Sequence, residues 1–322
     1  MPSLIRVVLA CLALAMPLTC KAQAFPSKPV KIIVGFPAGG PLDAHARLLA
    51  DRLGQVLGQP VIIDYKAGAG GTVGAEFVAR GEADGYTLLM ANTGTMVINP
   101  AVYAKLPYQT LRDFVPVART AQQPLALVVH PDVKAKNITE LVALAKASPG
   151  KLNYGSAGNG GISHLVPEMF KQATGTFIVH IPYRGSAPAF TDLMAGQVQL
   201  MAESIPQAAQ YVKAGKLRAL AVTSGERNAA LPEVPTMIEA GLKGFEVVGF
   251  YGVLAPAGTP RATVDRLSAA FKATLETPDV RSRMVAQGAD PAFLSSDDFT
   301  KFLAAEMPRW AKVVKDSGTQ LD

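Results

Sequence analysis

The sequence has few cysteines and no long run of hydrophobic residues. Both cysteines, Cys11 and Cys20, lie within the first 24 of its 322 residues. The rest of the chain can form no disulfide and offers no thiol nucleophile or cysteine metal ligand. No apolar stretch is long enough to cross a hydrocarbon core of about 30 Å. Stability therefore has to come from a hydrophobic core, which a chain of this length can build.

Charge of one sign is also not concentrated anywhere. Lysine and arginine number 31 against 25 acidic residues, and no run of five like charges occurs. Proteins that bind nucleic acid usually gather their basic residues in a stripe or patch. Nucleic acid is therefore not the expected partner.

Motifs for metals and nucleotides are missing as well. The four histidines (His45, His130, His164 and His180) form no H-x-H or H-x-x-x-H pair. A zinc or iron site needs three or four converging ligands, so we expect no metal and no cofactor. A Ser-His-Asp triad can be assembled from distant residues, but no serine lies in a G-x-S-x-G nucleophile elbow.

The first 24 residues have the layout of a secretory signal peptide. Arg6 provides a positive start, Val7–Leu18 an apolar segment, and Ala22-Gln23-Ala24 a small-x-small cleavage site. The mature protein would begin at Phe25. A lipid anchor on Cys20 is the alternative, although the usual small residue directly before a lipidated cysteine is missing. We expect export to the periplasm.

Strand-like and helix-like segments alternate along the rest of the chain, which predicts an α/β fold with mostly parallel sheets flanked by helices. One series runs from Val30–Gly35 to Tyr86–Ala91, and a second begins at Leu125–His130. A helix-rich tail follows, with helices expected at Thr263–Thr277 and Asp297–Lys315. Two series suggest two lobes joined by two crossings around a ligand cleft. The expected boundaries place 25–122 and 250–322 in lobe 1, and 123–249 in lobe 2.

Two glycine-rich loops are candidate anion sites, because each follows a strand and opens a helix. The first, Phe36–Pro41, contains Phe36, Pro37, Ala38 and Gly39, and the other, Tyr154–Gly161, contains Ser156, Asn159, Gly160 and Gly161. Unpaired N–H groups and the positive end of a helix favour an anion at such places. A plain tight turn is the alternative for the first loop.

A further glycine-rich loop, Ala67–Gly74, has a different explanation. It has neither the Gly-Lys-Ser/Thr ending of a P-loop nor the G-x-G-x-x-G spacing of a dinucleotide site. It also belongs to the second strand–helix unit, whereas the dinucleotide fingerprint belongs to the first. Its glycines are therefore predicted to allow a helix to pack closely on a strand.

Charged candidates follow two strands of the second series. Arg184 lies between a strand and a helix, and arginine can grip a carboxylate with two hydrogen bonds. A solvated loop charge is the equally simple alternative. Glu203 follows Val198–Ala202, where an acid would oppose an anionic ligand or favour one that carries a hydrogen-bond donor.

An ordered set of motifs resembles the solute-binding receptors of tripartite tricarboxylate transporters, the Bug family. The resemblance covers Phe25–Asp322. Its landmarks are Phe25-Pro26-Ser27-Lys28-Pro29, Asp43-Ala44-His45-Ala46-Arg47, Asp84-Gly85-Tyr86-Thr87-Leu88, Pro182-Tyr183-Arg184-Gly185, Leu231-Pro232-Glu233-Val234-Pro235-Thr236 and the Leu254–Pro260 segment LAPAGTP.

The resemblance implies a type II periplasmic binding protein fold and a transport role without catalysis. It also implies that a small organic carboxylate is held by main-chain groups and water between the two candidate loops. The contacts carried over are Phe36, Pro37, Ala38 and Gly39, with Ser156, Gly160 and Gly161 opposite; Asn159 is a further candidate because its side chain can donate to an anion. The Tyr183–Ala187 loop, with Arg184, Gly185 and Ala187, would lie near the other end of the ligand; Glu203 is a candidate from its place after a strand alone. The implied partners are a di- or tricarboxylate, amino acid or aromatic acid, and the membrane permease subunits; a monomer is expected.

Three departures from the family pattern are expected to affect the pocket. Relatives often have a hydroxyl residue where Gly161 stands and a tryptophan where Phe250 stands, and Pro41-Leu42 is also less usual. The sequence leaves two other functions open. One is a receptor that presents its ligand to a membrane sensor kinase, and the other is an exported ester or amide hydrolase that uses Ser156 or another serine.

Overall fold

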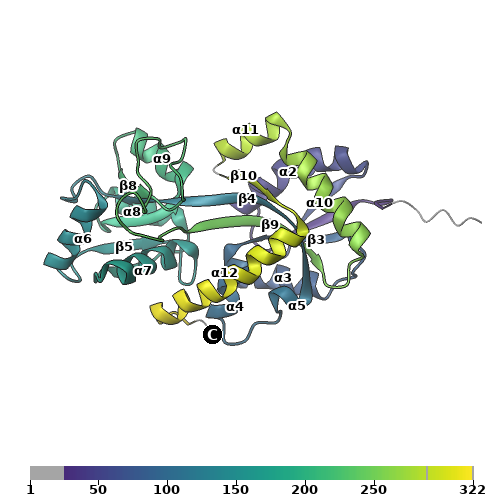
Figure 1. Cartoon of the computed structure of the whole chain (residues 1–322), viewed down its shortest axis with the longest axis horizontal. Coiled ribbons are helices and arrows are strands. Elements are labelled where there is room, and N and C mark those ends of the chain that lie inside the picture. Colours follow the sequence, from purple (N-terminus) through teal and green to yellow (C-terminus); the bar gives the residue numbers. More distant parts are fainter. Residues whose placement is uncertain (1–24, 288, 321–322) are drawn as a thin grey trace, which may run out of the picture.

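The computed structural model describes residues 25–287 and 289–320, and shows an elongated α/β molecule with two halves (Figure 1). The predicted signal peptide lies outside the described residues. The first half contains β1 (Val30–Val34), α2 (Pro41–Leu57), β2 (Val61–Tyr65), η1 (Ala69–Gly71), α3 (Thr72–Ala79), β3 (Thr87–Asn92), η2 (Gly94–Ile98), α4 (Asn99–Val102) and α5 (Thr110–Asp113).

A long strand, β4 (Phe114–Val129), leads from this half into the other. The second half contains α6 (Ile138–Ala147), β5 (Asn153–Ser156), α7 (Ile162–Thr174), β6 (Val179–Pro182), α8 (Ser186–Met194), β7 (Leu200–Ser204), α9 (Ile205–Lys213) and β8 (Arg218–Val222). The chain returns through β9 (Val248–Pro256), and the first half is completed by α10 (Arg261–Leu275), α11 (Pro278–Ala286), β10 (Asp290–Leu294) and α12 (Ser296–Ser317).

The strands follow the order β2-β1-β3-β9-β4-β7-β5-β6, with β10 and β8 also paired to β4. Strands β1, β2 and β3 are parallel, as are β5, β6 and β7. The two crossing strands, β4 and β9, are antiparallel to each other. The two-lobed α/β fold predicted from the sequence is therefore confirmed. The predicted lobe boundaries fall within β4 and β9 and stay a prediction.

Lobe 1 and lobe 2 each have a hydrophobic cluster, and a further cluster runs through both lobes. In lobe 1, Val30, Ile32 and Val34 of β1 pack with Leu49 of α2 and Phe271 of α10, while Ile33 faces the other side of the sheet. A strand buried on both faces is typical of a parallel sheet covered by helices. In lobe 2, Met201 of β7 packs with hydrophobic residues of α8 and α9 in a separate cluster, whereas Leu200 and Ala202 of β7 belong to the cluster that spans both lobes.

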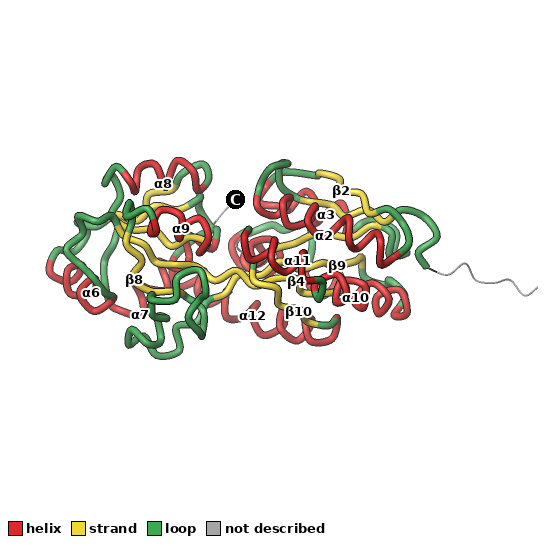
Figure 2. The backbone as a smooth tube through the Cα atoms, turned by 90° about the horizontal axis from the view of Figure 1, so that it is seen from above, coloured by secondary structure: helices red, strands yellow, loops and turns green. Residues whose placement is uncertain are grey.

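The C-terminal helix connects the two halves. Figure 2 shows α12 running beneath the junction of the lobes, and it contacts both α4 of the first half and α7 of the second. Its Trp310 is almost fully buried, and the indole N–H donates to Glu306 at 2.9 Å. Among the described residues, no helix combines the length and hydrophobicity required to cross a membrane.

Candidate functional site

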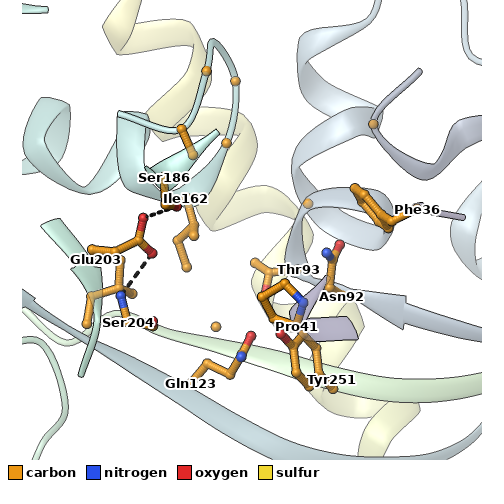
Figure 3. A pocket seen from close by; sticks show the side chains of 18 of the residues that line it. Phe36, Pro41, Asn92, Thr93, Gln123, Ile162, Ser186, Glu203, Ser204 and Tyr251 are labelled. Atoms are coloured by element: carbon orange, nitrogen blue, oxygen red, sulfur yellow. Dashed lines mark hydrogen bonds between the residues drawn. The ribbon is translucent and has the colours of Figure 1, made fainter. Parts of the chain in front are cut away.

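A cavity of about 590 Å³ lies between the lobes, where loops from both sides meet the two crossing strands (Figure 3). Cavities of a few hundred cubic ångströms between lobes are typical sites for small ligands. The lining residues are Phe36, Pro41, Gly70, Asn92, Thr93, Gly94, Asn99, Tyr103, Gln123, Leu125, Ala157, Gly158, Asn159, Gly160, Gly161, Ile162, Ser186, Ala187, Glu203, Ser204, Gln207, Gly249, Tyr251 and Gln287.

The first glycine loop contributes less to this cavity than the sequence suggests. Phe36 lines it, whereas Pro37, Ala38 and Gly39 are exposed and lie outside the lining. The Gly39 N–H donates to Oδ2 of Asp43 at 2.7 Å. One predicted anion donor is thus used by the protein's own carboxylate. The ligand contacts predicted for these three residues stay a prediction.

Asp43 is buried in the first turn of α2, and it is well supplied with hydrogen bonds. Burial raises its pKa, but hydrogen bonds from Gly39, Tyr65 and Arg47 outweigh that effect and hold the pKa below its usual range. Arg47 and Tyr65 donate to Oδ1 at 2.8 and 2.7 Å. An ionised Asp43 therefore stabilises the positive end of α2 next to the cavity.

The glycine loop of lobe 2 forms one wall of the cavity. Asn159, Gly160 and Gly161 all line it, and their contact with a ligand stays a prediction. Gly161 precedes the first turn of α7 and has no side chain to cap the helix. The N–H groups of Gly161, Ile162 and Ser163 find no acceptor among the described residues. Such free donors at a helix start favour a carboxylate.

Ser156, predicted to touch the ligand, lies behind this wall. It is fully buried, and its hydroxyl lies 2.6 Å from Nε2 of His180 and 3.1 Å from the carbonyl oxygen of Gly158. Its hydroxyl therefore helps to fix the conformation of the loop through its contact with Gly158. A direct contact with a ligand stays a prediction.

Two stacked imidazole rings support the same wall. His164 and His180 have ring centres 4.0 Å apart, and Tyr154 stacks on His180 at 4.7 Å. Burial lowers the pKa of His180 to about 3, and it also lowers the pKa of His164. Nδ1 of His164 accepts the N–H of Gly160 at 3.1 Å. A neutral His164 is thus part of what fixes the shape of the loop.

The close approach of Ser156 and His180 bears on the alternative of a hydrolase. A serine nucleophile requires a nearby base and access to the substrate. The hydroxyl of Ser156 has a histidine neighbour, but it is fully buried and Ser156 does not line the cavity. The pair is therefore not arranged as a nucleophile and base in this structure.

Only some of the remaining predicted residues line the cavity. Ala187 and Glu203 line the cavity, whereas Arg184 and Gly185 do not. Arg184 is exposed, which matches the alternative of a solvated loop charge. Gly185 donates its N–H to the carbonyl oxygen of Ala157 at 3.2 Å, joining two loops of lobe 2. Ligand contacts of Arg184 and Gly185 stay predictions.

The crossing strands provide the floor of the cavity, which sequence reasoning missed. Gln123 of β4 and Tyr251 of β9 both point toward it (Figure 3). Burial raises the pKa of the Tyr251 hydroxyl to about 12, so this group stays protonated. The N–H of Phe250 donates to Oγ1 of Thr93 at 2.7 Å, connecting β9 to the end of β3.

The end of β3 supplies further lining residues that the sequence analysis did not select. Asn92, Thr93 and Gly94 lie where this parallel strand ends. Ligands of α/β proteins usually bind at the carboxyl ends of strands. That rule, applied to the predicted strand Tyr86–Ala91, could have found them.

The glycines of Ala67–Gly74 pack closely, as predicted. A Cβ on Gly74 would lie 2.8 Å from the Cα of Gly35, and one on Gly35 would lie 2.8 Å from the Cα of Gly71. Helix α3 can therefore approach β1 only because side chains are missing there. Gly70 additionally lines the cavity.

The departures from the family pattern differ in their effect. The side chain of Phe250 packs edge-on against Phe299 and Phe302 of α12, at 5.4 and 5.5 Å between ring centres, and does not line the cavity. An effect of Phe250 on the pocket, which would have to act through its neighbours Gly249 and Tyr251, stays a prediction. Pro41 and Gly161 do line the cavity. A Cβ on Gly161 would meet only the carbonyl oxygen of Gly158, at 3.8 Å, so a side chain fits there.

Gly161→Ser is therefore expected to strengthen carboxylate binding. The backbone of Gly161 is extended (φ −79°, ψ 167°), as serine requires at a helix N-cap, and its hydroxyl would add a donor at the wall. One added hydrogen bond of ~1 kcal/mol corresponds to a roughly five-fold gain in affinity. Calorimetric titration of both proteins with the same carboxylate measures the difference. Unchanged or weaker binding would place the carboxylate away from Gly161.

No cluster of three or more histidine, cysteine, aspartate or glutamate side chains suitable for a metal ion occurs among residues 25–287 and 289–320.

Comparison with known proteins gives a consistent result. Residues 45–319 match the family model of the tripartite tricarboxylate transporter family receptor. Protein BugT of Bordetella pertussis is 37% identical over 320 residues, covering 99% of this chain and 98% of BugT. The solved structure of Rpa4515 from R. palustris with adipate superposes with a TM-score of 0.81 at 36% identity, covering 92% of this chain and all of that one. The structure of the periplasmic binding protein BugD superposes with a TM-score of 0.77 at 37% identity, covering 92% of this chain and 99% of that one.

Proposed function

The chain belongs to the tripartite tricarboxylate transporter receptor family, and we propose that it is a periplasmic receptor that captures a small organic carboxylate between its lobes and delivers it to a membrane permease. The observation that carries the proposal is the cavity at the lobe junction, one wall of which presents the unpaired N–H groups at the start of α7. Rpa4515, a relative of known structure, holds adipate.

The mechanism of capture follows from the geometry. Each lobe supplies part of the lining, and the lobes are joined by the crossing strands β4 and β9. A carboxylate that contacts both walls gains most when the lobes approach each other, so binding selects the closed arrangement. The surface of the closed form differs from that of the open form, so the permease can distinguish a receptor with bound ligand from an empty one. The proposal includes export through the signal peptide of residues 1–24, cleavage before Phe25 and a monomeric receptor.

A non-catalytic role accompanies this proposal. The relatives compared are a receptor family and binding proteins, and Ser156 is buried behind the cavity wall. Ligand presentation to a sensor kinase would use the same cleft. A gene for a large multi-spanning permease beside this one supports uptake, and a two-component gene pair supports sensing.

A thermal-shift screen tests the proposed function. The protein from Phe25 onward is unfolded and refolded to remove carried-over ligand, and then mixed with a panel of small carboxylates. A ligand at 100 times its dissociation constant adds ~2.7 kcal/mol of stability, which raises the melting temperature by several degrees. A shift confined to one chemical class supports the receptor. No shift with any carboxylate contradicts it.

A further inference from the structure

The cavity has a distinctive distribution of charge. No lysine, arginine or histidine occurs among its lining residues, and Glu203 is the single charged side chain among them. A pocket that binds a ligand with two negative charges is expected to contain positive side chains, or at least to contain no acidic ones. Here the one acidic or basic side chain is itself a carboxylic acid, so it cannot supply a positive charge.

Glu203 is buried at the end of β7, with 8% of its surface exposed. Oε2 accepts a hydrogen bond from the Ser186 hydroxyl at 2.5 Å, and Oε1 accepts one from the Ser204 N–H at 2.9 Å. Both donors are neutral, and no ion pair of Glu203 occurs within the described ranges. Each carboxylate oxygen keeps a further acceptor site for a group in the cavity. Burial raises the pKa of Glu203, which shows the cost of an ionised acid that has no positive partner.

The two donors to Glu203 belong to the starts of two helices. Ser186 is the first residue of α8, and Ser204 occupies the N-cap position of α9. The positive ends of these helices would otherwise attract an anion. Because Glu203 already lies against them, a ligand carboxylate at this place would bring a second acid next to the first, and ionising both acids at once would be unfavourable.

The start of α7, which lines another part of the cavity on the same lobe as Glu203, has the reverse character. The first turn of α7 presents the free N–H groups of Gly161, Ile162 and Ser163 and no acidic side chain. The cavity therefore offers donors for an anion at α7 and an acceptor for a cation at Glu203.

We propose that Glu203 is a specificity-determining residue that binds an ammonium group, so that the ligand is a carboxylate carrying an amine rather than a dicarboxylate. The inference rests on the proposed receptor function, since it assumes that a ligand carboxylate lies at α7. The amine donates to the unused acceptor sites of Glu203 and supplies the positive charge that this acid lacks. Ser186 and Ser204 hold the carboxylate in place for that contact (Figure 3).

Matched ligands test this inference directly. The ligand-free protein is titrated by calorimetry with 4-aminobutyrate and succinate, and with 6-aminohexanoate and adipate, so that an ammonium-bearing carbon replaces a carboxylate at two chain lengths. Hexanoate serves as the monocarboxylate without an amine. The same titrations are made with Glu203→Gln, which preserves the shape, and with Glu82→Gln, which makes the same change in net charge at an exposed position of lobe 1.

The wild-type protein and Glu82→Gln are expected to bind at least one amino carboxylate ten-fold or more tightly than its dicarboxylate partner and than hexanoate. Glu203→Gln is expected to lose at least ten-fold in affinity for that amino carboxylate and to gain affinity for the dicarboxylate. A wild-type preference for succinate or adipate, or a Glu203→Gln variant with unchanged selectivity, overturns the inference and leaves the receptor function intact. Failure of every carboxylate to bind overturns both.

Discussion

Gly161→Trp is expected to lower the affinity for the carboxylate ligand at least 100-fold while leaving the protein folded. Gly161 lies in the wall of the cavity directly before α7, and a Cβ there meets nothing closer than 3.8 Å. An indole therefore extends into the open cavity without displacing the core, and it covers the N–H groups at the start of the helix. A loss of 100-fold corresponds to ~2.7 kcal/mol of binding free energy.

The control for this variant is Gly161→Ser, which changes the same backbone position without filling the cavity. Calorimetric titration measures affinity, and the melting temperature without ligand reports on folding. Because the backbone at Gly161 is extended, both variants should melt within a few degrees of the wild type. Wild-type affinity in Gly161→Trp would show that the ligand binds elsewhere.

The free energy of unfolding is expected to fall as the pH drops from about 6.5 to about 4.5, and His45 is expected to account for much of this fall. His45 is 1% exposed, and burial lowers its pKa from 6.5 to about 3. Its Nε2 lies 2.8 Å from Oγ1 of Thr120, and its Nδ1 has no partner. In this pH range the unfolded chain binds a proton at His45 that the folded protein excludes, so acid favours unfolding.

The size of the effect follows from the same linkage. A buried histidine of this kind lowers the free energy of unfolding by ~1.4 kcal/mol for each pH unit, or ~2.7 kcal/mol over two units. The total free energy of unfolding of a protein is ~5–15 kcal/mol. His180, which is only partly buried, adds a smaller contribution of the same sign. The contribution of neutral His45 to the free energy of unfolding is fully present above pH 6.5 and is lost as the pH falls toward 3. Burial of Glu203 and Asp290 raises their pKa values and acts in the opposite direction.

Comparison with His45→Gln separates the contribution of His45 from these other groups. Chemical denaturation at the two pH values is expected to show a loss that is about 2 kcal/mol smaller in the variant than in the wild type. Histidine NMR resonances give an independent measure, since the His45 ring should stay neutral at pH 4.5. Equal pH dependence of both proteins, or a His45 ring that is protonated at that pH, contradicts this account.

The alternation of strands and helices could be predicted from the sequence because each element carries a local pattern. Helix α10 (Arg261–Leu275) overlaps most of the predicted range Thr263–Thr277, and α12 (Ser296–Ser317) contains the predicted range Asp297–Lys315. The first part of β4 could not be predicted in this way. It contains Pro116 and Pro124, and its pairing with β9 shifts register twice, so neither an apolar run nor a regular alternation marks it. Only its pairing with β9 and β10 makes it a strand.

The candidate site was predictable where it depends on local chain geometry. The loop containing Asn159, Gly160 and Gly161 lies in the cavity wall, as a glycine loop before a helix suggests. The floor could not be foreseen, since Gln123 and Tyr251 are far apart in the sequence and meet only through the pairing of β4 with β9. Nor does the sequence reveal that the Gly39 N–H is bound by Asp43, because that depends on the side-chain conformation within α2.

The central claim is that one small carboxylate binds between the lobes, against the start of α7. The most direct test is a calorimetric titration of ligand-free wild-type protein and Gly161→Trp, side by side, with the carboxylate that gives the largest thermal shift. The account predicts saturable binding of one ligand per chain to the wild type, recovery of the ligand chemically unchanged, and no measurable binding to the variant. Equal binding to both proteins, or conversion of the ligand to a product, would contradict it.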